Sequence, residues 1–166
     1  PLEGFPLKGI AWYQGETNTA DADAYADLLR LWAASWRRHF NDPDLAVVVA
    51  QLPGYGPRTA SPTDSDWARL REAQRRTVDA DPRMGLAVLI DQGVSHDIHP
   101  AHKEVVGERL ANEMLRLAYA GPAPRAPSPL DVRRTSQGIQ VRFAHADDGL
   151  IVYGSHDAAG FELCNG

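Results

Sequence analysis

The stretch K-G-I-A-W-Y-Q-G-E-T-N, residues 8–18, decides the fold of this chain. Its apolar part, residues 10–13, is too short for a helix and is typical of a short buried strand. Two side-chain amides, a carboxylate and a glycine follow at residues 14–18. In an open α/β sheet, ligands bind at the carboxyl ends of the strands. We therefore predict a functional site where this strand ends.

A second polar block, D-I-H-P at residues 97–100, has the same placement after a later apolar run. That run, residues 84–90, and the run at residues 45–52 are typical of strands that are buried on both faces. The hypothesis is a reactive site that is built from two strand ends.

Helical patterns separate the predicted strands. Apolar residues recur at helical spacing over about residues 20–40, 65–80 and 100–120. Helices that alternate with buried strands indicate a parallel sheet with right-handed crossovers. The sequence therefore predicts an α/β fold.

The helix ends follow from cap and proline signals. We expect the first helix to begin at residues 20–21, with Asn18 or Thr19 as its cap. Pro100 should lie in the first turn of the third helix, and Gly121 should end that helix in a left-handed conformation. The apolar face of the first helix is predicted to contain Tyr25, Leu28, Leu29, Trp32 and Trp36. The corresponding stripe of the third helix is Val106, Leu110, Met114 and Leu117.

The pattern changes after residue 121. The proline-rich residues 122–129 are typical of a linker. Residues 138–144 and 150–153 then alternate as two strands around the turn signal D-D-G. We predict an α/β domain at residues 1–121, a linker at 122–129 and the start of an antiparallel β module at 130–166.

Composition limits the function classes. The 166 residues are 43% hydrophobic and 23% charged, which is ordinary for a globular protein. A net charge of −5 with scattered cations argues against nucleic-acid binding. No apolar stretch approaches the ~20 residues of a membrane span, and the lone Cys164 excludes an internal disulfide. Because the chain starts at Pro1 without a methionine, we expect it to be a piece of a longer protein.

His99 is the first candidate for catalysis. A histidine in a loop with a carboxylate two residues earlier could be a general base that Asp97 orients. The alternative, which is commoner, is that Asp97 caps the following helix and His99 is a polar loop residue.

Gln14 could donate two N–H groups from a rigid strand end, as an oxyanion hole requires. The commoner alternative is a side chain that bonds to loop backbone. Glu16 could bind substrate or pair with a buried donor, and Asp91 has the same choice between function and loop structure.

A metal site must also be weighed, because His96, His99 and His102 form H-x-x-H-x-x-H. Three imidazoles could bind zinc. However, Pro100 interrupts the local geometry and the spacing matches no familiar zinc motif, so we predict no metal site.

The W-Y-Q-G-E-T-N block resembles that of sialate O-acetylesterase-like carbohydrate esterases, in the SGNH-hydrolase superfamily. W-A-R-L-R-E-A-Q at residues 67–74, A-V-L-I-D-Q-G-V-S-H-D-I-H-P at residues 87–100 and G-F-E at residues 160–162 resemble further blocks of that family, in order. The resemblance implies a flavodoxin-like three-layer fold around a parallel sheet, of which this chain would hold the C-terminal half.

The resemblance also implies roles for single residues. His99 matches the base that activates a serine, and Gln14 matches a block that helps to form the oxyanion hole. The superfamily commonly has an aspartate three residues before the histidine, where this chain has His96. Asp97, Asp91 or a backbone carbonyl would then orient His99, or a serine–histidine dyad would suffice. We further predict substrate contacts for Trp12, Gly15 and Glu16.

The chain departs from the family pattern at the nucleophile. The family's G-x-S-N block precedes W-Y-Q-G-E, and it is absent here. We therefore expect a carbohydrate O-acetylesterase whose serine lies outside this chain, without a cofactor, and little activity of this piece alone. The alternatives are a carbohydrate-binding remnant without catalysis and a metal-dependent hydrolase that uses His96, His99 and His102. Relatives suggest a periplasmic or secreted protein.

Overall fold

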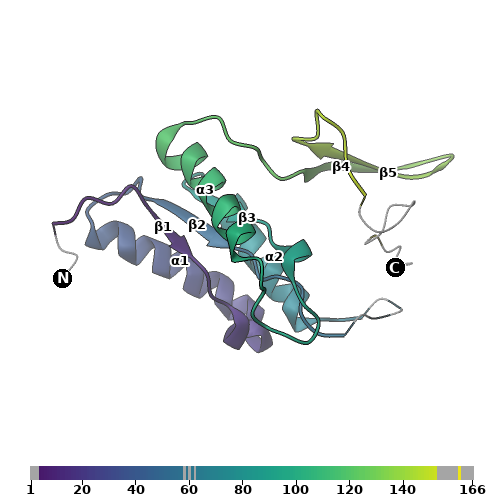
Figure 1. Ribbon diagram of the computed structural model, residues 1–166, viewed down its shortest axis with the longest axis horizontal. Helices are drawn as coiled ribbons and strands as arrows, with labels where there is room; N and C mark the ends of the chain where they lie inside the picture. Colours follow the sequence, from purple (N-terminus) through teal and green to yellow (C-terminus); the bar gives the residue numbers. More distant parts are fainter. Residues whose placement is uncertain (1–3, 58, 60, 62, 153–160, 162–166) are drawn as a thin grey trace. The chain divides into compact units, whose positions relative to one another are not determined.

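A computed structural model describes residues 4–57, 59, 61, 63–152 and 161. The chain divides into two compact units, Pro1–Pro124 and Arg125–Gly166. The first unit contains, in order, β1 (Gly9–Trp12), the 3₁₀ helix η1 (Glu16–Asp21), α1 (Ala22–His39), β2 (Ala46–Ala50), α2 (Asp66–Asp79), β3 (Met84–Ala87), the 3₁₀ helix η2 (Ile90–Gln92) and α3 (Lys103–Tyr119) (Figure 1).

The three strands of the first unit form a parallel sheet in the order β1-β2-β3. Ile10 pairs with Val47, and Val48 pairs with Gly85. All residues of β2 are buried, as expected for a central strand that is covered on both faces. The predicted α/β fold is confirmed.

Helices cover both faces of this sheet. α1 and α2 pack against Val47 and Val49 on one face, together with Tyr25 and Leu70. α3 packs on the other face, where Val106 contacts the cluster that includes Ala50 and Leu89. The unit therefore has three layers, and each fully buried Leu or Val contributes about 1.5–3 kcal/mol to its stability.

The first helix differs from its prediction in two ways. Its cap is Asp21, which accepts a hydrogen bond from the Ala24 N–H at 3.4 Å, because residues 16–21 form the separate helix η1. The buried stripe is Ala22, Tyr25, Leu29 and Ala33. Leu28 is 53% exposed, so its placement in the core was wrong.

The second helix follows its prediction. Ser65 caps α2 by accepting a hydrogen bond from the Ala68 N–H at 3.3 Å. Leu70 and Ala73 are buried, and Trp67 is partly buried.

Both ends of the third helix were predicted wrongly. α3 begins at Lys103 with His102 at the cap position, so Pro100 lies before the helix. At the other end Ala120, with φ of 49°, takes the left-handed conformation that was expected of Gly121. The Gly121 N–H donates to the Leu115 carbonyl at 3.0 Å, which requires the backbone to reverse one residue earlier. Of the predicted stripe only Val106 is fully buried.

β3 is also shorter than the predicted strand. It ends at Ala87, and residues 90–92 turn into η2 rather than continuing the sheet. The apolar residues Leu89 and Ile90 therefore belong to the turn, and Leu89 is still fully buried.

The second unit contains an antiparallel hairpin that the sequence placed wrongly. β4 (Ser128–Thr135) pairs with β5 (Gly138–Ala144) through a two-residue loop, although residues 128–129 were expected in the linker. Short loops favour pairing of neighbouring strands, and the Asp147-Asp148-Gly149 signal forms a separate turn. Residues 150–152 are not a strand, and Tyr153 lies outside the described residues.

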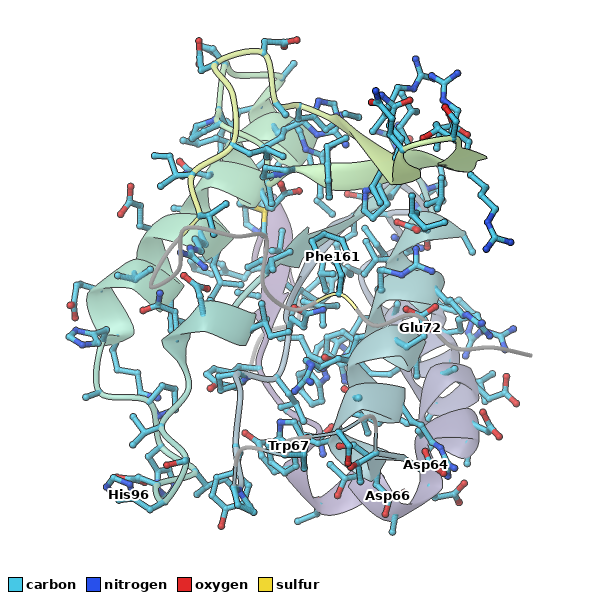
Figure 2. All side chains as sticks on the ribbon, turned by 90° about the vertical axis from the view of Figure 1, so that its right-hand side faces the viewer. Asp64, Asp66, Trp67, Glu72, His96 and Phe161 are labelled. Carbon is cyan, nitrogen blue, oxygen red and sulfur yellow. The ribbon has the colours of Figure 1, made fainter. Side chains whose placement is uncertain are left out.

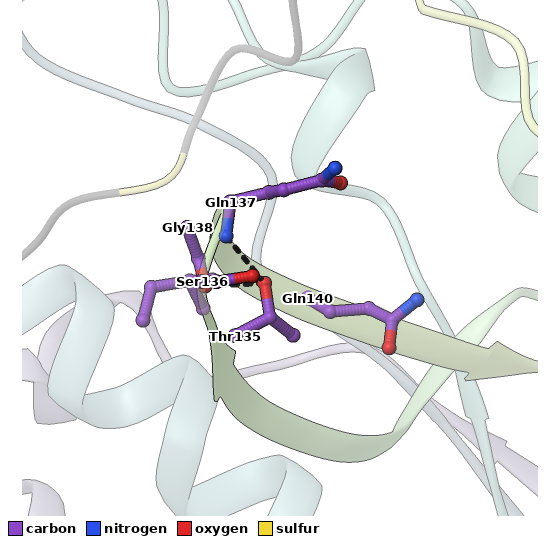
Figure 3. A pocket seen from close by; sticks show the side chains of 6 residues that line it. Thr135, Ser136, Gln137, Gly138 and Gln140 are labelled. Atoms are coloured by element: carbon purple, nitrogen blue, oxygen red, sulfur yellow. Dashed lines mark hydrogen bonds between the residues drawn. The ribbon is translucent and has the colours of Figure 1, made fainter.

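A shallow pocket lies at the hairpin loop and is lined by residues 135–140 (Figure 3). The Thr135 hydroxyl accepts from the Gln137 N–H at 3.2 Å and donates to the Gly138 carbonyl at 3.1 Å. These bonds close the loop. The assignment of this unit as the start of a larger β module stays a prediction, and in the G-F-E element Gly160 and Glu162 lie outside the described residues.

Among the described residues, no helix has the length and apolar character that crossing a membrane requires.

Candidate functional site

Three polar segments leave the same edge of the parallel sheet, because parallel strands end on the same side. Residues 14–18 follow β1, residues 51–57 follow β2, and residues 88–99 follow β3. Figure 2 shows Trp67, at the start of α2, and His96, in the third segment, at the same end of the unit. The two strand-end blocks that the sequence singled out therefore share one edge.

Direct contacts hold the second and third segments together. The Gly56 N–H donates to the Ser95 carbonyl at 3.1 Å. Gly93 lies against the backbone of Gly54 so closely that a methyl group on Gly93 would overlap it. Residues 51–57 and the loop that carries His99 are thus packed backbone to backbone.

A further contact joins the start of α3, directly after the third segment, to the end of β1. The ammonium group of Lys103, four residues after His99, lies 5.4 Å from the centre of the Tyr13 ring. Tyr13 directly precedes Gln14. Cation–π contacts of this kind are attractive by about 0.5–1 kcal/mol at exposed sites, so they favour the approach of the two segments.

Gln14 is held through both its backbone and its side chain. Its carbonyl accepts hydrogen bonds from the Tyr25 hydroxyl at 2.9 Å and from Gln74 Nε2 at 3.3 Å. Its own Nε2 donates to Asn18 Oδ1 at 2.7 Å. An amide nitrogen carries two N–H groups, so the bond to Asn18 orients the amide and uses one of them. The simpler interpretation expected this side chain to bond to loop backbone. The structure instead shows it bonded to another side chain, that of Asn18.

Gly15 is required at its position by packing and by conformation. It is buried, its φ is 151°, and a Cβ there would lie 2.7 Å from Leu70 Cδ2. Only glycine adopts such a φ without strain. The turn after β1 therefore packs directly against α2.

Two of the predicted substrate contacts lie next to this turn. Glu16 is partly buried at the start of η1. Burial raises the pKa of Tyr13, and the negative charge of Glu16 raises it further. Trp12 is partly buried and its ring centre lies 4.2 Å from that of Trp32. The structure thus gives Trp12 a packing contact, and the substrate-binding roles of Trp12, Gly15 and Glu16 stay predictions.

Asp97 and His99 form a local pair. Asp97 Oδ1 accepts from the backbone N–H of His99 at 2.8 Å and lies 3.4 Å from His99 Nδ1. The hydrogen bond from the His99 backbone lowers the pKa of Asp97, which keeps this carboxylate charged. The side chain of His99 is 84% exposed. Since α3 begins at Lys103, Asp97 does not cap it, so that part of the alternative is wrong, and the catalytic role of His99 stays a prediction.

Asp91 is committed to a different partner. Its two carboxylate oxygens accept from the Arg109 guanidinium at 2.5 and 2.8 Å, and Arg109 also donates to the Val88 carbonyl at 2.7 Å. The bonds from Arg109 lower the pKa of Asp91. Asp91 therefore ties the loop after β3 to α3, and whether it also has a functional role stays a prediction.

The three histidines that suggested a metal site are not gathered together. His102 Nδ1 lies 3.2 Å from Glu104, whereas His99 faces Asp97. Within the described residues, no three His, Cys, Asp or Glu side chains are placed to hold a metal ion.

Sequence reasoning missed the three residues that hold the site in place, Tyr25, Gln74 and Arg109. Tyr25 was expected in the core for its ring alone. Gln74 stands four residues after the buried Leu70, and a polar residue on a buried helical stripe is a signal that it bonds to something inside the fold. Arg109 lies next to Leu110 but outside the predicted buried stripe of the third helix, so nothing in the sequence indicated its bonds to Asp91 and Val88.

Comparison with known proteins identifies the family. The family model described as "Carbohydrate esterase, sialic acid-specific acetylesterase" matches residues 2–116. The chain belongs to this family. The resemblance drawn from the W-Y-Q-G-E-T-N and D-I-H-P blocks is thereby confirmed.

One solved structure is informative for this member of the sialic acid-specific acetylesterase family. XAC1771, described as a novel carbohydrate acetylesterase from Xanthomonas citri, is 36% identical to it, with a TM-score of 0.77. The similarity covers 87% of this chain and 34% of XAC1771, so the chain spans about a third of that protein's length. A search of curated proteins finds no match. The roles of individual site residues stay predictions.

Proposed function

We propose that this chain supplies part of the active site of a carbohydrate O-acetylesterase that works by a serine–histidine mechanism. The proposal rests on one observation: a fixed amide donor, Gln14, and an exposed histidine, His99, both lie on segments that follow strands at one edge of the sheet. The family and XAC1771 support the reaction class, since both are described as acetylesterases of carbohydrates.

In this mechanism the nucleophile is a serine outside the chain. His99 takes the serine proton as the oxygen attacks the acetyl carbon, and it then passes that proton to the leaving sugar oxygen. The second N–H of Gln14 stabilises the charge that develops on the carbonyl oxygen. Water, activated by His99, attacks the acyl-enzyme, breaks the acyl–serine bond and releases acetate. No cofactor takes part.

Asp97 is the residue we assign to orient His99. Its carboxylate lies 3.4 Å from His99 Nδ1 and is held by the backbone of the same loop. A carboxylate at this ring nitrogen stabilises the imidazolium that forms when His99 accepts a proton. Asp91 is less suited to this role, because both of its oxygens accept from Arg109.

The decisive experiment compares this chain with the full-length product of its reading frame. Acetate release is measured on acetylated sugars of several kinds, with sialic acid esters and xylan-type esters among them. We expect a G-x-S-N block upstream, turnover by the full-length protein, and little or none by residues 1–166 alone. Activity should persist after chelation.

Three results would count against the proposal. A native protein without an upstream serine block that binds acetylated sugar without releasing acetate would support the non-catalytic alternative. Loss of turnover on chelation, restored by zinc, would support a metal-dependent hydrolase. Full turnover by residues 1–166 alone would place the nucleophile inside this chain.

A further inference from the structure

Gln74 is a fully buried amide that bonds to backbone groups at the ends of two strands. Its Nε2 donates to the Gln14 carbonyl at 3.3 Å and to the Ala50 carbonyl at 3.5 Å. Its Oε1 accepts from the Leu52 N–H at 3.0 Å. Gln74 is 0% exposed. The side chain thus fills the gap where β1 and β2 separate, and it takes the place of strand partners there.

Tyr25 approaches the same carbonyl from the other helix of this layer. Its hydroxyl donates to the Gln14 carbonyl at 2.9 Å, and the residue is 3% exposed. Burial raises the pKa of Tyr25, so the hydroxyl keeps its proton and remains a donor at neutral pH. The Gln14 carbonyl therefore receives two donors, one from α1 and one from α2.

These two donors control the orientation of the peptide unit between Gln14 and Gly15. Gly15 has no side chain that could restrain this peptide, and it packs instead against Leu70 and Gln74 of α2. A carbonyl that accepts two hydrogen bonds has one favoured direction. That direction sets the orientation of the backbone at Gln14 and therefore the direction in which its side-chain amide points. Displacement of a catalytic group by about 1 Å can cost about a hundredfold in rate.

We propose that Tyr25 and Gln74 are positioning residues, which aim the Gln14 amide at the developing oxyanion by clamping the Gln14 carbonyl. The inference rests on the proposed acetylesterase function, to which it adds two residues that do not touch the substrate.

The test compares three variants of the full-length protein in steady-state hydrolysis of an acetylated sugar. Tyr25→Phe removes one donor and keeps the ring. Gln74→Leu removes the other donor, together with the acceptor of the Leu52 N–H, and introduces an apolar side chain of similar size. We expect each to lower kcat about tenfold to a hundredfold, with KM changed less than about twofold, because the substrate itself loses no contact. The double variant should cost less than the product of the two single effects, since both donors serve one carbonyl.

Two controls separate positioning from stability. Leu29→Ala opens a cavity in the same core beside α1, where Leu29 is 2% exposed. Thr77→Val alters a buried residue of α2 whose hydroxyl has no hydrogen-bond partner among the described residues. Leu29→Ala should lower Tm at least as much as Gln74→Leu while kcat stays within about twofold of the parent. Equal losses of kcat in Leu29→Ala and Gln74→Leu would overturn the proposal.

A readout that is independent of activity decides the proposal even if the proposed function fails. Absence of turnover in the unmodified full-length protein would refute the acetylesterase function and leave the geometric claim open to direct measurement. Crystal structures of Tyr25→Phe and Gln74→Leu should then show the Gln14 amide displaced, and hydrogen exchange should speed up at the Leu52 amide in Gln74→Leu. An unmoved Gln14 amide in both variants would overturn the proposal.

Discussion

The segment after β1 and the segment after β3 hold their functional residues in opposite ways. Gln14 and Gly15 are held by side chains from α1 and α2, and Gly15 is buried. The backbone N–H of His99 bonds only within its own loop, to Asp97, and its side chain is 84% exposed.

The difference teaches that the two halves of the site are built with different rigidity. A donor for a developing charge is most effective when it is fixed before the reaction. Gln14 meets this requirement, because Tyr25 and Gln74 donate to its carbonyl and Asn18 binds its amide, so that moving it would leave polar groups unpaired. A histidine that must accept and return a proton can lie on a less stable exposed loop.

Replacement of the exposed residue should have the largest effect on activity and almost none on the fold. His99→Ala is expected to lower kcat of the full-length protein by at least about a thousandfold, since removal of the base disables the nucleophile. Tm should change little, because the side chain is exposed. The measurement is acetate release together with thermal unfolding. His102→Ala, at a second exposed histidine, is the control and should retain normal turnover; near-normal activity of His99→Ala would refute the assignment.

Replacement of the fixed donor should have the next largest effect. Gln14→Ala keeps the clamped carbonyl and removes only the amide, so kcat should fall about a hundredfold or more while Tm stays close to that of the parent. Asn18→Ala, which removes the partner of that amide, should have a smaller effect of the same kind. Steady-state kinetics tests both variants, and a change of KM alone would reassign Gln14 to substrate binding.

A methyl group at Gly15 tests whether the buried segment is as tightly built as the contacts indicate. Gly15→Ala combines backbone strain at a φ of 151° with overlap against Leu70, so we expect a loss of about 2–4 kcal/mol in the free energy of unfolding. Gly56→Ala is the matched control. Gly56 has a φ of 92° with no atom within 4 Å of the added Cβ, so only strain of about 1–2 kcal/mol is expected. Equal losses in urea unfolding would show that packing at Gly15 adds nothing.

The smallest effect concerns the pH dependence of stability in the loop after β3. Arg109 lowers the pKa of Asp91 in the folded state below its unfolded value of about 3.9. The stabilisation is therefore complete above about pH 5 and is lost as the pH falls through the folded pKa. Since the pair is half exposed, Asp91→Asn should cost about 1 kcal/mol or less at pH 7. Urea unfolding of both proteins should show this difference shrinking at pH 3; a constant difference would contradict the linkage.

The sequence predicts the sheet well, because buried strands and amphipathic helices leave strong periodic signals. The run at residues 45–52 contains the central strand, and α2 lies within the predicted residues 65–80. The prediction failed for short segments, where several conformations are similar in energy and no periodic signal distinguishes them. Residues 16–21 form a 3₁₀ helix, and the first strand of the hairpin lies in a proline-containing segment that was interpreted as a linker.

The site shows the same division. Gln14, Asp97 and His99 stand in compact polar blocks that follow apolar runs, so the sequence exposes them as candidates. Tyr25 and Gln74 stand inside amphipathic helices, where a polar residue on the buried stripe signals a bond inside the fold but does not identify the partner. Their partners are backbone groups that are distant in the sequence, 11 residues away for Tyr25 and 60 residues away for Gln74. Only the folded sheet brings them to the carbonyl of Gln14.

The contact between Gly54 and Gly93 has a consequence for how this protein can evolve. Because the two backbones touch, with Gly56 bonded to Ser95 beside them, neither segment can be lengthened at that point without pushing the other aside. Insertions are therefore expected to be tolerated only beyond this contact, away from the sheet edge. The glycine contact thus sets the spacing between residues 51–57 and the loop that carries His99.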